Sequence, residues 1–315
     1  MSAPGPVVCV VGPTASGKSA LAELVAERLG SAVVSMDAMQ VYRGMDVGTA
    51  KTPVAERRVP LLMVDVADVG EDYSVQRFQG EARACVDALL GSRRTPVLCG
   101  GTGLYLNAVI DEMEFPAGER GGGRRDAYEA LARARGAEAL HALLAERDPR
   151  SADLIHPNNV RRVVRALEML DEGVSYAAHH EGLHKRAAHY DARVWGLTMS
   201  RDRLYERIDA RVDSMVAAGL FDEVRHLTDE GLTVDVTAGQ AIGYKEVLDA
   251  LAGRCSEQEA VELIKRRTRR YAKRQLSWFR HDARVRWIDL DETGLEDAAD
   301  LVCSDLGRRP ANGTI

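Results

Sequence analysis

An eight-residue loop close to the start of the chain has the composition of a phosphate-binding site. It has the form G-x-x-x-x-G-K-[ST]. In such a loop the glycines let successive backbone N–H groups point at one anion, the lysine adds positive charge, and the final hydroxyl can bind Mg²⁺. A triphosphate, a monophosphate and an isoprenoid diphosphate would all satisfy these donors. The residues expected around the phosphate are Gly12, Pro13, Thr14, Ala15, Ser16, Gly17, Lys18 and Ser19.

The segments around this loop predict the elements that position it. Val7 to Val11 is an apolar run before the loop, and Ala32 to Ser35 and Pro96 to Cys99 predict two further strands separated by helical patterns. This alternation is typical of an α/β fold, here a P-loop NTPase-like parallel sheet flanked by helices. Ligands of such sheets bind beyond the carboxyl ends of the strands, so the loop, Asp37 and Thr102 should converge on one crevice.

The middle of the chain changes character. Phe115 to Gly123 is rich in Gly, Glu and Arg and predicts a linker, and the residues after it have helical spacing until strand character returns at Arg193. We therefore expect a core domain formed by 1–118 and 193–315, and a small all-helical insert domain at 119–192.

Composition narrows the class of protein. The 315 residues are 45% hydrophobic and 29% charged, with a net charge of −6, as in a soluble globular protein. The sequence suggests neither a signal peptide nor a membrane span, so a cytoplasmic location is expected. Five scattered cysteines without a C-x-x-C pair predict neither disulfides nor a zinc site.

One segment is strongly basic despite the negative net charge. Between Lys265 and Arg280 there are eight lysine and arginine residues and no acidic residue. Ser256 and Glu259 have the spacing of a capping box, which predicts that this segment lies on a long helix. A polyanion is one partner that such a helix would suit, and pairing with acidic residues elsewhere in the fold is the alternative.

Several segments together resemble the bacterial tRNA dimethylallyltransferases. They occur in that family's order from near the start of the chain to the basic segment, and each is weak alone but the set is specific. The segments are Gly12–Ser19, Asp37–Lys51, Gly100–Tyr105, His156–Asn159 with Arg161-Arg162, Gly243-Tyr244 and Arg269–Arg280.

The resemblance implies transfer of a dimethylallyl group from dimethylallyl diphosphate to N6 of the adenosine 3′ to the tRNA anticodon, adenosine 37, with release of diphosphate. It implies Asp37 as the general base for a weakly nucleophilic amine. It also implies that Lys18, Thr102 and Arg211 act on the departing diphosphate, and that Ser19 binds Mg²⁺.

The resemblance further implies binding of the tRNA anticodon stem-loop. A monomer is expected, although the sequence itself does not reveal the oligomeric state. The family segments that touch tRNA match Asp37, Ala38, Met39, Gln40, Thr102, Arg125, Arg161, Arg162, Val163, Val164, Arg165, Gln240, Ala241, Ile242, Gly243, Tyr244, Lys245, Arg270, Lys273 and Arg274.

This chain departs from the family pattern at two places. Ala38 stands where the family usually has Ser, so a hydroxyl contact is missing there. Leu61 and Leu62 follow Pro60 in a segment that commonly carries histidines, so no role of those histidines can be transferred to this chain.

Other interpretations stay open. A related enzyme that prenylates AMP or ATP, or a P-loop kinase of a small molecule, would have less need of the basic helix. An RNA-binding module could use the loop only as a nucleotide-dependent switch. For single residues, Asp37 could cap a turn, and Arg207 and Arg211 could be ordinary surface charges.

Overall fold

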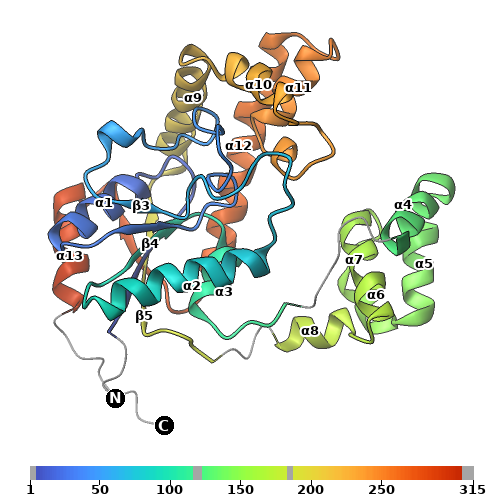
Figure 1. Ribbon diagram of the computed structural model, residues 1–315, viewed down its shortest axis with the longest axis horizontal. Helices are drawn as coiled ribbons and strands as arrows, with labels where there is room; N and C mark the ends of the chain where they lie inside the picture. The colour runs from blue at the N-terminus through green and yellow to red at the C-terminus, as the bar shows by residue number, and fades with distance from the viewer. Residues whose placement is uncertain (1–4, 116–122, 183–186, 307–315) are drawn as a thin grey trace. The chain divides into compact units, whose positions relative to one another are not determined.

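The chain folds into two compact units. The computed structural model describes residues 5–115, 123–182 and 187–306 (Figure 1). One unit comprises 1–110 together with 188–315, and the other comprises 111–187. The division lies a few residues before the boundaries expected at 119 and 192, and most of the predicted linker, 116–122, lies outside the described residues.

A six-stranded sheet forms the centre of the larger unit. All pairings are parallel, in the order β3-β2-β4-β1-β5-β6. This confirms the predicted α/β fold with a parallel sheet. The strands are β1 (Val7–Val11), β2 (Val33–Ser35), β3 (Leu61–Leu62), β4 (Val97–Gly100), β5 (Ala192–Thr198) and β6 (Arg286–Asp289).

Helices cover both faces of this sheet. Residues of α1 (Lys18–Arg28) and α13 (Leu295–Leu306) pack with Val8 and Val10 of β1. Residues of α2 (Val75–Gly91) and α3 (Gly103–Ile110) share a second core with the alternate β1 residues. Because the sheet is buried on both sides, β1 is a continuous apolar run and shows no polar alternation.

Four α-helices of the larger unit lie between β5 and β6 in the sequence, and they are drawn in yellow to orange-red in Figure 1. They are α9 (Arg201–Ala217), α10 (Leu220–Asp229), α11 (Tyr244–Leu251) and α12 (Glu257–Arg280). The predicted start of the basic helix is confirmed. Ser256 accepts from the Glu259 N–H at 3.2 Å, and the Glu259 carboxylate accepts from the Ser256 N–H at 2.8 Å.

The smaller unit is built from helices around a core of its own. Leu140, Leu144, Val163, Val164 and Leu167 are its fully buried apolar side chains. The helices are α4 (Gly123–Arg135), α5 (Ala137–Arg147), α6 (Pro149–Leu154), α7 (Val160–Asp171) and α8 (Tyr176–Gly182). Across all the described ranges, no helix is both long and apolar enough to cross a membrane.

Candidate active site

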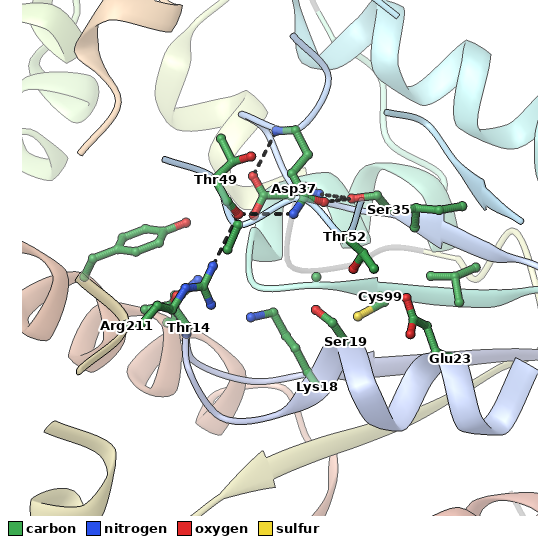
Figure 2. A pocket seen from close by; sticks show the side chains of 17 residues that line it. Thr14, Lys18, Ser19, Glu23, Ser35, Asp37, Thr49, Thr52, Cys99 and Arg211 are labelled. Carbon is green, nitrogen blue, oxygen red and sulfur yellow. Dashed lines mark hydrogen bonds between the residues drawn. The ribbon is translucent and has the colours of Figure 1, made fainter. Parts of the chain in front are cut away.

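One pocket at the carboxyl edge of the sheet brings together residues from several parts of the larger unit. They come from the glycine-rich loop and α1, from β2 and the turn after it, from the segment 49–52, from β3 and β4, and from α9 and α12. Lys18 and Ser19 lie between Arg211 on one side and Cys99 and Glu23 on the other (Figure 2). The polar side chains lining the pocket are those of Thr14, Lys18, Ser19, Glu23, Ser35, Asp37, Gln40, Thr49, Thr52, Cys99, Arg211, Tyr271 and Gln275.

The loop between β1 and α1 has the backbone of an anion cradle. Gly17 caps α1 with φ 96°, and Ala15 also has a positive φ of 63°. Arg207 on α9 holds this shape, because its Nε donates to the Ala15 carbonyl at 2.8 Å. The Ser16 hydroxyl is buried without a hydrogen-bond partner among the described residues. Such an orphaned group and the amino end of α1 suit a bound phosphate.

Two half-buried cations face this cradle. The Lys18 ammonium donates to the Pro13 carbonyl at 3.3 Å, and the Arg211 guanidinium donates to the Thr49 carbonyl at 3.3 Å. Neither forms an ion pair within the described ranges, and Arg211 Nε is buried without a partner there. Burial lowers the pKa of both side chains, and the negative charge of Asp37 opposes this. A diphosphate would supply the negative charge that these two groups lack.

Asp37 divides its two oxygens between the backbone and the pocket. Its Oδ1 accepts from the N–H groups of Met39 at 2.9 Å and Gln40 at 3.4 Å, so the carboxylate caps the turn after β2. No hydrogen bond in the described structure engages Oδ2. The turn-capping and general-base interpretations of Asp37 are therefore compatible, since they use different atoms.

The amide of Gln40 is already held at both ends. Its Oε1 accepts from the Ser35 hydroxyl at 2.9 Å, and its Nε2 donates to the Thr49 carbonyl at 3.3 Å. Contact with a nucleobase edge would add to these bonds or replace one of them.

Thr102 lies beside the pocket and is joined to it through α12. Tyr271, which lines the pocket, has its side chain close to that of Thr102. One helical turn later, Gln275 accepts from the Thr14 N–H at 2.8 Å and donates to the Gly101 carbonyl at 3.0 Å. A side chain at Gly101 would collide with this amide. Thus α12 fixes the phosphate loop relative to the glycine turn after β4.

Sequence reasoning missed Tyr271 and Gln275 as parts of this site. Both lie within the basic segment, whose charge dominated the interpretation. Their spacing of four residues on the side facing the core was the available signal.

The donors around Ser19 suit a weakly ligated Mg²⁺. The Ser19 side chain lies close to the Cys99 thiol, whose pKa burial raises to about 11, and Glu23 lines the same end of the pocket. The described residues contain no group of three or more acidic, His or Cys side chains that could hold a metal. A Mg²⁺ ion here would therefore take most of its ligands from diphosphate and water, as this ion commonly does.

The exposed positive charges of α12 form one stripe. Three other basic residues of this helix are paired with acidic partners: Lys265 with Asp213, Arg267 with Glu246 and Arg269 with Asp209. Both sequence interpretations of the basic segment thus apply, each to different residues. The remaining basic residues of α12 are all exposed and have no ion pair in the described chain, and successive members are four, three, one and six residues apart. We call them the basic stripe: Arg266, Arg270, Lys273, Arg274 and Arg280.

The expected tRNA-contacting segments contain side chains that are not at the surface, and for these the expectation needs correction. Val163, Val164 and Tyr244 have no exposed area, and Ala241 is also buried. Apolar packing accounts for the two valines, because they belong to the core of the smaller unit. Tyr244 belongs to the core of the larger unit. Any RNA contact predicted for these segments would have to come from their other side chains.

The polar members of these segments are more accessible. Arg162 is exposed. Lys245 is half-buried and donates to the Gln240 side chain at 3.1 Å. Arg125 forms ion pairs with Glu129 at 3.1 Å and Glu168 at 3.4 Å.

Comparison with known proteins identifies the family. A model of the IPP transferase family matches residues 40–282, which is most of the chain. The chain belongs to this family. A model described as isopentenyl transferase matches residues 5–59, the part that contains the phosphate loop.

Similar IPP transferases are known from several bacteria. The tRNA dimethylallyltransferase of Geobacillus kaustophilus is 46% identical, over 91% of this chain and 91% of the relative. That of Streptomyces coelicolor is 46% identical, over 94% of this chain and 93% of the relative.

Solved structures of IPP transferases have the same fold. The tRNA isopentenylpyrophosphate transferase of Bacillus halodurans has a TM-score of 0.71 at 42% identity, covering 96% of this chain and 97% of that one. A eukaryotic dimethylallyltransferase, captured acting on tRNA, has a TM-score of 0.80 at 26% identity, covering 97% and 80%.

Proposed function

We propose that this protein transfers a dimethylallyl group from dimethylallyl diphosphate to N6 of the adenosine 3′ to the anticodon, adenosine 37, in tRNAs. The observation that carries the proposal is one pocket that holds two half-buried cations, Lys18 and Arg211, and the Asp37 carboxylate. Among the described residues the two cations have no ion-pair partner, and one oxygen of Asp37 accepts no hydrogen bond. The cations suit the leaving diphosphate and the carboxylate suits the amine proton.

In the proposed reaction, the N6 nitrogen forms a bond to C1 of the dimethylallyl group while the bond from C1 to the diphosphate oxygen breaks. The diphosphate leaves with that electron pair. Asp37 Oδ2 takes the proton from the amine, whose lone pair is otherwise delocalised into the adenine ring. Because Oδ1 is fixed by two backbone amides, the carboxylate keeps its orientation during proton transfer.

The barrier depends on how well the departing anion is stabilised, since the allylic carbon can carry positive charge. Lys18, Arg211 and the amides of the glycine-rich loop are the protein groups that would neutralise the diphosphate, and Thr102 would donate a hydrogen bond near the departing oxygen. Mg²⁺ bound through Ser19 would add positive charge to the diphosphate when present.

The acceptor side uses the basic stripe of α12. Its exposed arginines and lysine would bind RNA phosphates, which position an RNA without reading its sequence. The target base must leave the anticodon loop stack to reach a pocket above the phosphate cradle. We assign the reaction to the cytoplasm, where tRNAs are used, and expect the protein to act as a monomer.

The basic stripe also favours tRNA over a free nucleotide as the acceptor. AMP or ATP would need only the pocket, whereas five unpaired surface cations along one helix suit an extended polyanion. The likeness to tRNA-modifying relatives supports the same choice and gives the kinase and switch alternatives no support.

The test is incubation with dimethylallyl diphosphate, Mg²⁺ and unmodified tRNA, followed by mass analysis of the nucleosides, with AMP and ATP as separate acceptors. We expect a dimethylallyl adduct on the adenosine 3′ to the anticodon. If the adduct forms only on AMP or ATP, the acceptor is a free nucleotide and the tRNA part of the proposal is wrong. Nucleotide hydrolysis without any adduct would refute prenyl transfer.

A further inference from the structure

The segment from Gly44 to Lys51 reaches one wall of the pocket through Thr49 and Ala50, and its backbone orients two of the pocket's side chains. We call this segment the wall segment, or the wall. The carbonyl of Thr49 accepts from Gln40 Nε2 at 3.3 Å and from an Arg211 guanidinium nitrogen at 3.3 Å (Figure 2). The placement of this one oxygen therefore affects both a group on the acceptor side and a group on the diphosphate side.

Glu223, on α10, binds this wall from outside the pocket. Its Oε2 accepts from the N–H groups of Asp46 at 3.0 Å and Val47 at 2.6 Å. Its Oε1 accepts from the N–H of Gly48 at 3.0 Å and from the Tyr244 hydroxyl at 2.6 Å. Three successive backbone N–H groups directed at one anion form a nest, an arrangement that binds a carboxylate far better than a neutral group.

Tyr244 packs against the same wall. Its side chain has no exposed area, and a Cβ atom at Gly48 would lie 2.5 Å from its ring. Burial and the adjacent Glu223 carboxylate raise the pKa of Tyr244, so its hydroxyl stays protonated and donates to Glu223. The glycine at position 48 thus permits a contact that places the ring directly against the backbone.

The rest of the wall is braced by its own side chains. The Thr49 hydroxyl donates to the Met45 carbonyl at 2.6 Å. The buried Lys51 ammonium donates to Asp65 at 2.6 Å and to the Tyr42 carbonyl at 3.0 Å. Between these braces, the amides of 46–48 are held by Glu223.

We propose that Glu223 is a positioning residue for the transfer reaction: through the backbone amides of 46–48 it holds the Thr49 carbonyl in the place where that oxygen orients Arg211 and Gln40. Glu223 does not line the pocket. Its effect on the reaction is therefore indirect. The inference rests on the proposed function, because the reaction in question is the proposed dimethylallyl transfer.

The first test is binding of inorganic diphosphate with Mg²⁺, measured by calorimetry on the full-length chain. In Glu223→Gln one half of the carboxylate becomes an NH₂ group facing backbone donors. We expect diphosphate affinity to fall about tenfold, the equivalent of one hydrogen bond to a charged group. The matched control is Asp222→Asn, which removes the same charge from the neighbouring residue. The Asp222 side chain is 81% exposed and, among the described residues, forms an ion pair with Arg225 alone. The control should bind as the wild type does.

A double-mutant cycle separates positioning from general destabilisation. If Glu223 acts through Arg211, then Glu223→Gln should weaken diphosphate binding much less in an Arg211→Ala background than in the wild type. Tyr244→Phe keeps the ring and removes one donor to Glu223, so it should fold normally and show a smaller loss of the same kind.

Two results would overturn the proposal. One is unchanged diphosphate affinity in both Glu223→Gln and Tyr244→Phe. The other is a loss that is fully additive with Arg211→Ala. Dimethylallyl transfer to tRNA by the wild type is measured separately, so a failure of the proposed function would appear there and would leave the binding cycle interpretable.

Discussion

Under the proposed function, Asp37 has both a structural and a reactive role. Its Oδ1 caps the turn after β2, while no hydrogen bond in the described structure engages Oδ2. A substitution that changes Oδ2 but keeps an acceptor in the place of Oδ1 can therefore test the two roles separately.

Asp37→Ala should abolish measurable transfer, and Asp37→Asn should lower the single-turnover rate by about 10²- to 10⁴-fold, the usual contribution of a general base. The asparagine keeps an oxygen that can accept from Met39 and Gln40, so the turn should persist. The tRNA dissociation constant should remain close to that of the wild type in both. A near-normal rate in Asp37→Asn, or parallel loss of binding and rate in Asp37→Ala, would contradict the base assignment.

The lowered pKa of the half-buried Lys18 gives the site a pH dependence with a definite sign. Burial lowers its pKa in the free protein, and a bound diphosphate would raise it again. Diphosphate affinity should be full while the free site is protonated and should fall as the pH rises through the lowered pKa. Calorimetric titration between about pH 7 and pH 10 checks this. In Lys18→Arg the guanidinium stays charged, so diphosphate affinity should change little over that pH range. If the affinity of the variant falls with pH as steeply as that of the wild type, Lys18 is not the cause of the pH dependence.

At the scale of elements, α12 has two faces with different tasks. Tyr271 and Gln275 face the catalytic turns, whereas the basic stripe faces solvent. Under the proposed function, this division would place RNA binding and the fixing of the phosphate loop on a single helix.

Charge reversal at Lys273 and Arg274 should weaken tRNA binding. The slope of log affinity against log salt concentration should fall by the equivalent of about one to two released counterions. Filter binding over a series of salt concentrations measures both quantities. The control is reversal of Arg93 and Arg94, which are exposed just before the amino end of β4, away from the carboxyl edge that forms the pocket. Equal salt slopes in the stripe variant and the wild type would assign RNA binding to another surface.

The elements that the sequence revealed are those with local signals. The phosphate loop has a fixed spacing, and Ser256 with Glu259 announces the start of α12 before any packing is known. Strand β3 has only two residues and no pattern of its own, so it was not predicted. Glu223 also gave no signal, because its role depends on backbone amides about 175 residues earlier in the chain.

At the scale of the whole molecule, the two units have separate hydrophobic cores. The core of 111–187 contains no residue of the sheet-containing unit. The helical character of the smaller unit was predictable from the spacing of its valines and leucines. The same spacing explains why Val163 and Val164 pack inside and have no surface for RNA.

Inorganic diphosphate with Mg²⁺ should therefore stabilise the two units unequally. At a concentration 100 times its dissociation constant, the ligand should raise the free energy of unfolding of the sheet-containing unit by about 2.7 kcal/mol. Hydrogen exchange should slow around the loop 12–19 and remain unchanged in 123–182. Equal protection of both ranges would show that the units unfold together.

The close approach of α12 to the turn after β4 has a practical consequence for observing the protein at work. Trp278 lies so near Gly103 that a side chain there would collide with its indole, yet 46% of its surface is exposed. Trp195 is buried and Trp287 only partly exposed. Trp278 is thus an intrinsic fluorophore at the boundary between the basic stripe and Thr102, and its emission can report the arrival of RNA in real time without any label.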